Sequence, residues 1–255
     1  MLNNEQLARS YRTDSDSALL TGFMFRFPDS DASSNYTISD DPARLPLAGL
    51  TLLDASLKRA FDIVFATTFL LVALPALIIL AIALQIDSPG PLFFIQKRIG
   101  LSGRSFACIK FRTMHVNAGE LLSQILATSP AARREWEADH KLRDDPRVSR
   151  LGRLVRKLSL DELPQLYNIL VGEMSVVGPR PIVEAEIVKY GIHFSDYSAL
   201  KPGLTGLWQV SGRNDVSYAE RVQLDCEYRR RASFLFDMQI VTKTIPAVLL
   251  ANGSY

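Results

Sequence analysis

Cysteine and histidine are scarce in this chain of 255 residues, which contains two cysteines and three histidines. Cys108 and Cys226 are far apart and form no CxxC pattern, so we predict buried small hydrophobic residues rather than a disulfide or a metal site. His115, His140 and His193 show no metal-ligand spacing, which argues against a zinc site.

A strong excess of either charge is also missing, because the formal net charge is only +2. This balance predicts no general attraction to nucleic acid. The distribution is uneven, since residues 1–50 contain four Lys and Arg against seven Asp and Glu, a net charge of −3, while the rest carries +5. A basic body beside an apolar segment suits an anionic membrane surface.

A secretory signal is missing as well. The apolar stretches Leu19-Leu20 and Phe23-Met24-Phe25 are too short, and no basic segment precedes them. Residues 1–50 include the polar run from Pro28 to Asn35, which lacks periodicity and predicts a poorly ordered N-terminal extension. We therefore expect the body of the chain to begin on the cytoplasmic side.

One long apolar run is present, from Ile63 to Ile86, and its 24 residues carry no charge. About 20 apolar residues suffice for a transmembrane helix. However, Pro75 lies at the middle of the run, where it removes a helix hydrogen bond. Cations flank both ends, which favours both ends on the cytoplasmic face: Lys58, Arg59, Lys97, Arg98 and Arg104. We predict a re-entrant hairpin of two half-helices within residues 51–90, and a spanning helix remains the alternative.

The segment from residue 91 to 255 predicts a small catalytic domain of the α+β class, mainly helical. Pro91 to Arg98 and Ser105 to Phe111 are typical of two strands, with a glycine-containing turn at residues 100–103. Residues 117–142 predict one or two polar helices. Ser217 and Glu220 form an S-x-x-E capping box, which predicts a following helix.

An acidic pair, Asp161 and Glu162, is the strongest candidate for chemistry. Ser159 and Glu162 also match a capping box, so the two carboxylates are open to a second interpretation as helix caps. Adjacent side chains on a helix diverge by about 100°, so the pair is poorly placed to flank a sugar ring as glycosidase carboxylates do. The pair can instead present one carboxylate to phosphorus and the other to a metal or a proton.

Cations surround this pair in the sequence and are candidates for phosphate binding. Arg180 lies between two prolines, whose restrained backbone could present its guanidinium to a phosphate. The set of predicted phosphate-binding and nucleotide-binding residues is Lys110, Arg112, Arg156, Arg180, Gln209 and Arg213.

From about Lys58 to Tyr255 the chain resembles the bacterial sugar transferase family, the monotopic polyprenyl-phosphate hexose-1-phosphate transferases. Several motifs occur in order and carry the resemblance: Phe94-x-Gln96-x-Arg98-x-Gly100-x-x-Gly103, Lys110 to Met114, Asp145-Pro146-Arg147, Arg156 to Pro164, Gly172 to Ser175, Gly178 to Pro181, and Pro202 to Gly206. Two positions depart from the family pattern. Leu74-Pro75 stands where Ser-Pro is common, and Ala232 takes the place of a common tryptophan.

The resemblance implies a monotopic protein on the cytoplasmic face of the bacterial inner membrane that uses Mg²⁺. Its implied partners are a UDP-sugar, undecaprenyl phosphate and membrane lipid, and a homodimer is kept open. Asp161 is the implied nucleophile, with Glu162 as its partner, and both are candidate metal ligands. The segment from Gly206 to Tyr218 resembles exopolysaccharide-initiating members, which implies galactose-1-phosphate transfer. Three alternatives remain: glucose-1-phosphate transfer, a glycosyltransferase that releases UDP, and a membrane scaffold without catalysis.

Overall fold

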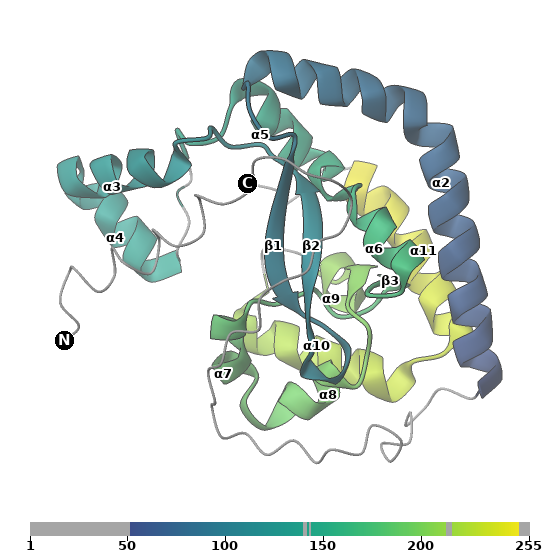
Figure 1. Ribbon diagram of the computed structural model, residues 1–255. Coiled ribbons are helices and arrows are strands. Elements are labelled where there is room, and N and C mark those ends of the chain that lie inside the picture. Colours follow the sequence, from purple (N-terminus) through teal and green to yellow (C-terminus); the bar gives the residue numbers. More distant parts are fainter. Residues whose placement is uncertain (1–51, 140–141, 143, 213–215, 250–255) are drawn as a thin grey trace. The chain divides into compact units, whose positions relative to one another are not determined.

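The computed structural model describes residues 52–139, 142, 144–212 and 216–249. Within these residues the fold is α+β and mainly helical, with two small two-stranded sheets (Figure 1), which confirms the predicted class. The predicted N-terminal extension and Arg213 lie outside the described residues. The helices are α2 (Leu52–Asp87), α3 (Ala118–Thr128), α4 (Pro130–Asp139), α5 (Arg150–Lys157), α6 (Gln165–Val171), α7 (Ile187–Tyr190), α8 (Phe194–Ser198), α9 (Leu207–Val210), α10 (Tyr218–Arg231) and α11 (Phe234–Leu249).

The strands are short and pair locally. They are β1 (Phe93–Ile99), β2 (Ser105–Phe111), β3 (Ser175–Val177) and β4 (Gly203–Thr205). Single 3-10 turns lie between the elements: η1 (Leu101–Gly103), η2 (Leu160–Glu162), η3 (Glu184–Glu186) and η4 (Gly191–His193).

The apolar run forms one helix, α2, of 36 residues that continues through Pro75. Two separate half-helices were expected, and the structure instead has a continuous helix with a pronounced bend (Figure 1). A proline inside a helix removes one backbone hydrogen bond and is a common cause of such bends. The helix is long and apolar enough to cross a membrane, and only 6% of its most apolar 18-residue window is buried. Its middle therefore presents apolar side chains outward.

Both ends of α2 are bonded to elements that follow it in the same compact unit. Near the start, Lys58 Nζ donates to the Val177 carbonyl of β3 at 2.8 Å and to Asp237 of α11 at 2.5 Å. Close by, the carboxylate of Asp62 is buried and accepts bonds from Ser175 Oγ and the Val176 N–H. At the far end, Asp87 accepts a bond from the N–H of Leu151 in α5. Polar contacts therefore fix both ends of the helix to one domain.

The predicted strands form an antiparallel hairpin, β1 with β2, in which Phe93 lies opposite Phe111 and Ile99 opposite Ser105. Ser102 adopts a positive φ of 58° in the turn, which completes the reversal between the strands. One end of the hairpin continues into the domain, because the Ile99 N–H donates to the Ile182 carbonyl at 2.9 Å. The hairpin thus places Arg98 of β1 beside the segment that contains Arg180, and Arg98 Nη1 donates to the Pro181 carbonyl at 2.9 Å.

The second sheet brings two motifs of the chain together. β3 pairs with β4 in parallel, with Ser175 opposite Gly203 and Val177 opposite Thr205. The approach is close at Gly178, since a Cβ added there would lie 2.3 Å from the Lys201 carbonyl oxygen. A side chain at this glycine would push the two strands apart. The sheet lies in the main core with buried residues of α2, β2, α6 and α11, including Ala66, Cys108, Leu166, Ile169 and Ile240.

The C-terminal helices complete the core. The predicted Ser217–Glu220 capping box is present at the start of α10, with Ser217 Oγ accepting from the Glu220 N–H. In α11, Phe236, Asp237 and Ile240 are buried. Cys108 and Cys226 are both buried and free, as predicted.

Candidate active site

The acidic pair lies in η2, between α5 and α6. The predicted Ser159–Glu162 capping box is wrong. Ser159 has a positive φ of 56°, and within the described residues 144–212 its side chain makes no capping bond at η2, where only its carbonyl accepts from the Glu162 N–H. A left-handed residue at this point ends α5 and turns the chain. The Glu162 side chain is therefore free to reach a distant partner.

That partner is a cation from the hairpin. Lys110 Nζ lies 2.6 Å from Glu162 Oε1, and Arg180 Nη2 lies 3.9 Å from the same oxygen. Burial by itself would raise the pKa of Glu162, but Lys110 and Arg180 outweigh it and hold this pKa below its usual value. Glu162 is consequently ionised at neutral pH.

Asp161 has the opposite environment although it is the next residue. Burial, together with the neighbouring charge of Glu162, raises the pKa of Asp161 from 3.8 to about 6, against the opposing pull of Lys110 and Arg156. Two adjacent carboxylates whose pKa values are pushed apart are typical of catalytic pairs. Near neutral pH Asp161 is mostly ionised but poorly solvated, which favours reaction with an electrophile.

A small pocket lies beside Glu162. Its volume is about 10 Å³, room for about one water molecule. Gln209 Oε1 and Arg98 Nε are buried on it and have no hydrogen-bond partner among the described residues. Buried polar atoms of this kind are normally satisfied, so they indicate a polar ligand. The pocket is lined by Arg98, Cys108, Lys110, Glu162, Gln165, Arg180, Pro181, Gly203, Leu204 and Gln209.

Four predicted residues thus meet at one place: Lys110, Glu162, Arg180 and Gln209. Asp161 is adjacent to the pocket in the chain but does not line it. Arg98 and Gln165 do line it and were not predicted as site residues. Arg98 belongs to the Phe94-x-Gln96-x-Arg98 motif, which was the available signal, whereas nothing in the sequence distinguished Gln165.

Two other predicted arginines are placed differently. Arg112 donates to the carbonyls of Ser88, Pro91 and Met114 and to Ser88 Oγ. Four of the five N–H donors of this guanidinium are therefore occupied in joining β2 to the end of α2. Arg156 donates to Thr113 Oγ1 at 2.7 Å and lies close enough to favour ionised Asp161. Its phosphate contact stays a prediction, as does that of Arg112.

An aromatic platform lies beneath Arg180. The guanidinium carbon of Arg180 lies 6.0 Å from the ring centroid of Trp208, and that of Arg221 lies 4.6 Å from the same ring. Cation–π contacts of this kind limit the orientations of an otherwise exposed side chain. The guanidinium of Arg180 therefore lies between Trp208 and Glu162.

The acidic pair fits a Mg²⁺ ion by its donor set. Mg²⁺ in phosphate-transfer sites is commonly held by one or two carboxylates together with substrate phosphates. Glu162 engages Lys110 through Oε1, which leaves Oε2 and the Asp161 carboxylate as oxygen donors. Asp161 and Glu162 would hold the ion.

Residues 53–251 match the family model described as Bacterial sugar transferase. This chain belongs to that family. It is 47% identical over 225 residues to the exopolysaccharide production protein ExoY of Rhizobium meliloti, a match that covers 88% of this chain and 97% of that protein.

Two further relatives are longer than this chain. The chain is 50% identical over 199 residues to the UDP-galactose-lipid carrier transferase of Erwinia amylovora. It is 48% identical over 199 residues to the undecaprenyl-phosphate galactose phosphotransferase of Salmonella typhimurium. Each match covers 78% of this chain but only 42% of the relative, so the chain spans less than half the length of these two proteins.

Proposed function

We propose that this chain transfers a hexose-1-phosphate from a UDP-sugar to undecaprenyl phosphate, as the first membrane step of exopolysaccharide synthesis. The observation that carries this proposal is the Asp161–Glu162 pair, which lies against a cationic pocket and next to the apolar helix. Leu160, directly before the pair, packs against the cluster that contains Leu84 of α2. A lipid phosphate held at α2 would therefore lie near the carboxylates.

The proposed reaction has two steps. A carboxylate oxygen of Asp161 attacks the sugar-bearing phosphorus, the phosphoanhydride bond breaks, and UMP leaves with the electron pair. A phosphate oxygen of the lipid then attacks the same phosphorus, the aspartyl–phosphorus bond breaks, and the Asp161 carboxylate is regenerated. Dividing the transfer in this way means that the soluble and lipid substrates need not react in one transition state.

The surrounding residues have distinct roles in this scheme. Lys110 keeps Glu162 ionised, and the guanidinium of Arg180, the exposed cation of the pocket, is placed to bind phosphate oxygens. Mg²⁺, when bound, supplies neutralisation of the diphosphate charge. The pocket is far smaller than the roughly 300–1,000 Å³ of small-molecule sites, so Arg180 and its neighbours must move when a sugar nucleotide binds.

We infer that α2 enters the membrane and returns rather than crossing it. Both ends are hydrogen-bonded to the same compact unit, at Lys58 and Asp62 on one side and at Asp87 on the other. A spanning helix would place its ends on opposite faces, about 30 Å of hydrocarbon apart. The bend in α2 and the cations at both ends support the same topology, with the catalytic domain on the cytoplasmic face.

We further propose that the transferred hexose is galactose. Two relatives at about half identity are named for galactose, but a few pocket contacts decide which hexose is bound, and glucose remains the alternative. Competition between UDP-galactose, UDP-glucose and N-acetylated UDP-sugars tests this. A clear preference for an N-acetylated donor would overturn it. A homodimer stays a prediction.

The leaving nucleotide tests the reaction type. Purified full-length protein in detergent, given UDP-sugar and undecaprenyl phosphate, should release UMP. Release of UDP would mean glycosyl transfer, and release of neither nucleotide would mean a scaffold. Labelled donor alone should leave a phosphosugar on Asp161, detectable by mass spectrometry. Asp161→Asn should lose both signals, whereas Asp144→Asn, at an exposed carboxylate outside the pocket, should keep both.

A further inference from the structure

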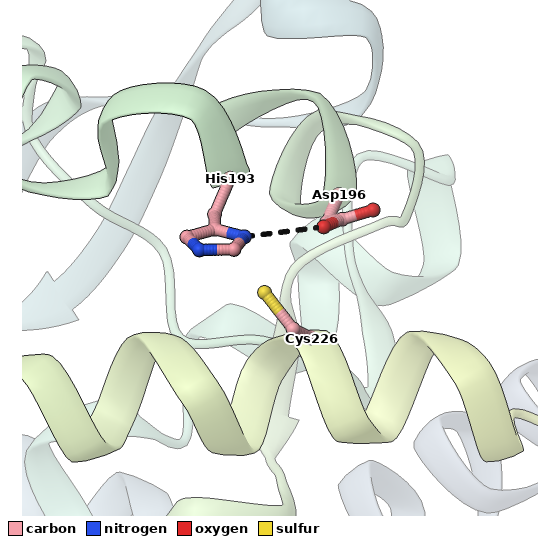
Figure 2. Close-up of side chains that lie close together, drawn as sticks. All are labelled: His193, Asp196 and Cys226. Carbon is pink, nitrogen blue, oxygen red and sulfur yellow. Dashed lines mark ion pairs between the residues drawn. The ribbon is translucent and has the colours of Figure 1, made fainter.

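A second group of ligand-type side chains lies away from the acidic pair. His193 ends η4, Asp196 lies in α8, and Cys226 faces them from α10 (Figure 2). Their potential ligand atoms all lie within 4.8 Å of one another. In the described part of the chain, this is the one group of three or more His, Cys, Asp or Glu residues whose ligand atoms lie so close together.

We propose that His193, Asp196 and Cys226 form a zinc site with a water molecule as the fourth ligand. The set offers one nitrogen, one oxygen and one sulfur, the three atom types that Zn²⁺ binds in proteins. Mg²⁺ prefers oxygen ligands and avoids sulfur. This site would therefore select a different ion from the one expected at Asp161 and Glu162.

The geometry needs a small contraction to accept the ion. Zinc–ligand distances of about 2.0–2.3 Å place tetrahedral ligands about 3.5 Å apart. His193 Nδ1 and Asp196 Oδ2 are already 3.6 Å apart. The His193 side chain is 47% exposed, so the core does not enclose its ring and the contraction would be made on the side of His193.

The carboxylate is already oriented by a neighbour. Arg229 Nη1 lies 3.3 Å from Asp196 Oδ1, which leaves Oδ2 directed at His193. Outer contacts of this kind typically fix the ligands of a metal site. Arg229 also donates to the Ser195 carbonyl at 2.8 Å, so α10 and α8 are joined beside the proposed ion.

The ion would cross-link the segment from residue 191 to 198 to α10. Tyr197, within that segment, donates its hydroxyl to the Ile99 carbonyl at 2.6 Å and accepts from the Ile182 N–H. Ile99 directly follows Arg98 in the chain, and Ile182 lies two residues after Arg180. A structural zinc ion here would stiffen the wall behind the catalytic pocket.

The plain alternative is that Cys226 packs in the core and hydrogen-bonds Asp196 through its thiol. A test with the metal alone separates the two. Full-length protein in detergent is dialysed against buffered Zn²⁺ with excess Mg²⁺, and bound zinc is counted by elemental analysis. Co²⁺ is then used as a spectroscopic replacement, since a cobalt–thiolate bond gives a near-ultraviolet charge-transfer band.

One zinc per chain and a cobalt–thiolate band are expected. His193→Gln and Cys226→Ser should each weaken zinc binding more than about 10–100-fold, the usual effect of losing an outer contact. His115→Gln, at a histidine outside this group, is the matched control and should keep both signals. No zinc retained over Mg²⁺, or a cobalt band that survives Cys226→Ser, would overturn the proposal. His193 is exposed, so its variant tests binding even if Cys226→Ser folds poorly.

Discussion

Replacing Asp161 by asparagine should stabilise the protein while abolishing transfer. The carboxylate is mostly buried beside Glu162, and its pKa is raised from 3.8 to about 6. That difference corresponds to about 3 kcal/mol that the folded state spends on keeping the group ionised at neutral pH. Asparagine has the same shape without the charge. The value of about 3 kcal/mol already includes the opposing attraction of Lys110 and Arg156, so the gain in stability should be at most this large.

The stability difference between Asp161→Asn and the wild type should depend on pH. A carboxylate with a raised folded pKa favours folding below the unfolded pKa, near 3.8, and loses that contribution as the pH rises through about 6. Asp161→Asn should therefore match the wild type near pH 3.8 and exceed it above pH 6. With roughly 2–4 °C per kcal/mol for a chain of this size, the melting temperature at pH 7.5 should rise by several degrees.

Glu162→Gln is the matched comparison, and it should lower the stability at neutral pH rather than raise it. The pKa of Glu162 is lowered, so its contribution to stability is present above its unfolded pKa of 4.5 and is lost as the pH falls through the folded value. Glutamine would remove the negative charge that pairs with Lys110, at a cost of about 1–3 kcal/mol. Thermal unfolding in detergent from pH 4 to 8 measures both variants. A less stable Asp161→Asn at pH 7.5 would refute the burial argument, and retained transfer would refute Asp161 as the nucleophile.

Three further predictions concern the anchor and the metal. Lys58→Met should cost about 3–5 kcal/mol, because it removes the cation that neutralises the buried carboxylate of Asp237. Adding Asp237→Asn to Lys58→Met should recover part of the lost free energy of unfolding in denaturation experiments. If the losses of the two single variants simply added, the Lys58–Asp237 ion pair would not contribute to stability. Chelation with EDTA should stop UMP release and added Mg²⁺ should restore it, whereas full turnover in excess EDTA would exclude the magnesium proposal. Single cysteines placed at each end of α2 should both react with a membrane-impermeant reagent only from the cytoplasmic side, and labelling of one end from the periplasm would rule out the re-entrant topology.

The sequence by itself determined those helices and strands that a pattern of a few neighbouring residues specifies. The strands of the hairpin followed from apolar runs around a glycine turn, and the start of α10 followed from Ser217 and Glu220. The apolar run determined that a long exposed helix exists. Its bonds to the domain through Lys58 and Asp87 connect residues 179 and 64 positions apart, which no local pattern encodes.

The acidic pair shows that a local pattern does not predict which partner a side chain contacts. The Ser159–Glu162 spacing matches a capping box, but Ser159 adopts a left-handed conformation and Glu162 pairs with Lys110, 52 residues away. Likewise, the sequence makes Arg112 and Arg180 equally good candidates for phosphate binding. Packing decided that Arg112 binds backbone carbonyls while Arg180 faces Glu162.

The group formed by His193, Asp196 and Cys226 makes the same point for potential metal ligands. Histidine and cysteine spacing along the chain argued against a zinc site, yet α8 and α10 bring His193, Asp196 and Cys226 within 4.8 Å. Residue types and short spacings are fixed by the sequence and decide which chemistry is available. Which of those side chains meet depends on the packing of segments far apart in the chain, and only the tertiary structure determines that.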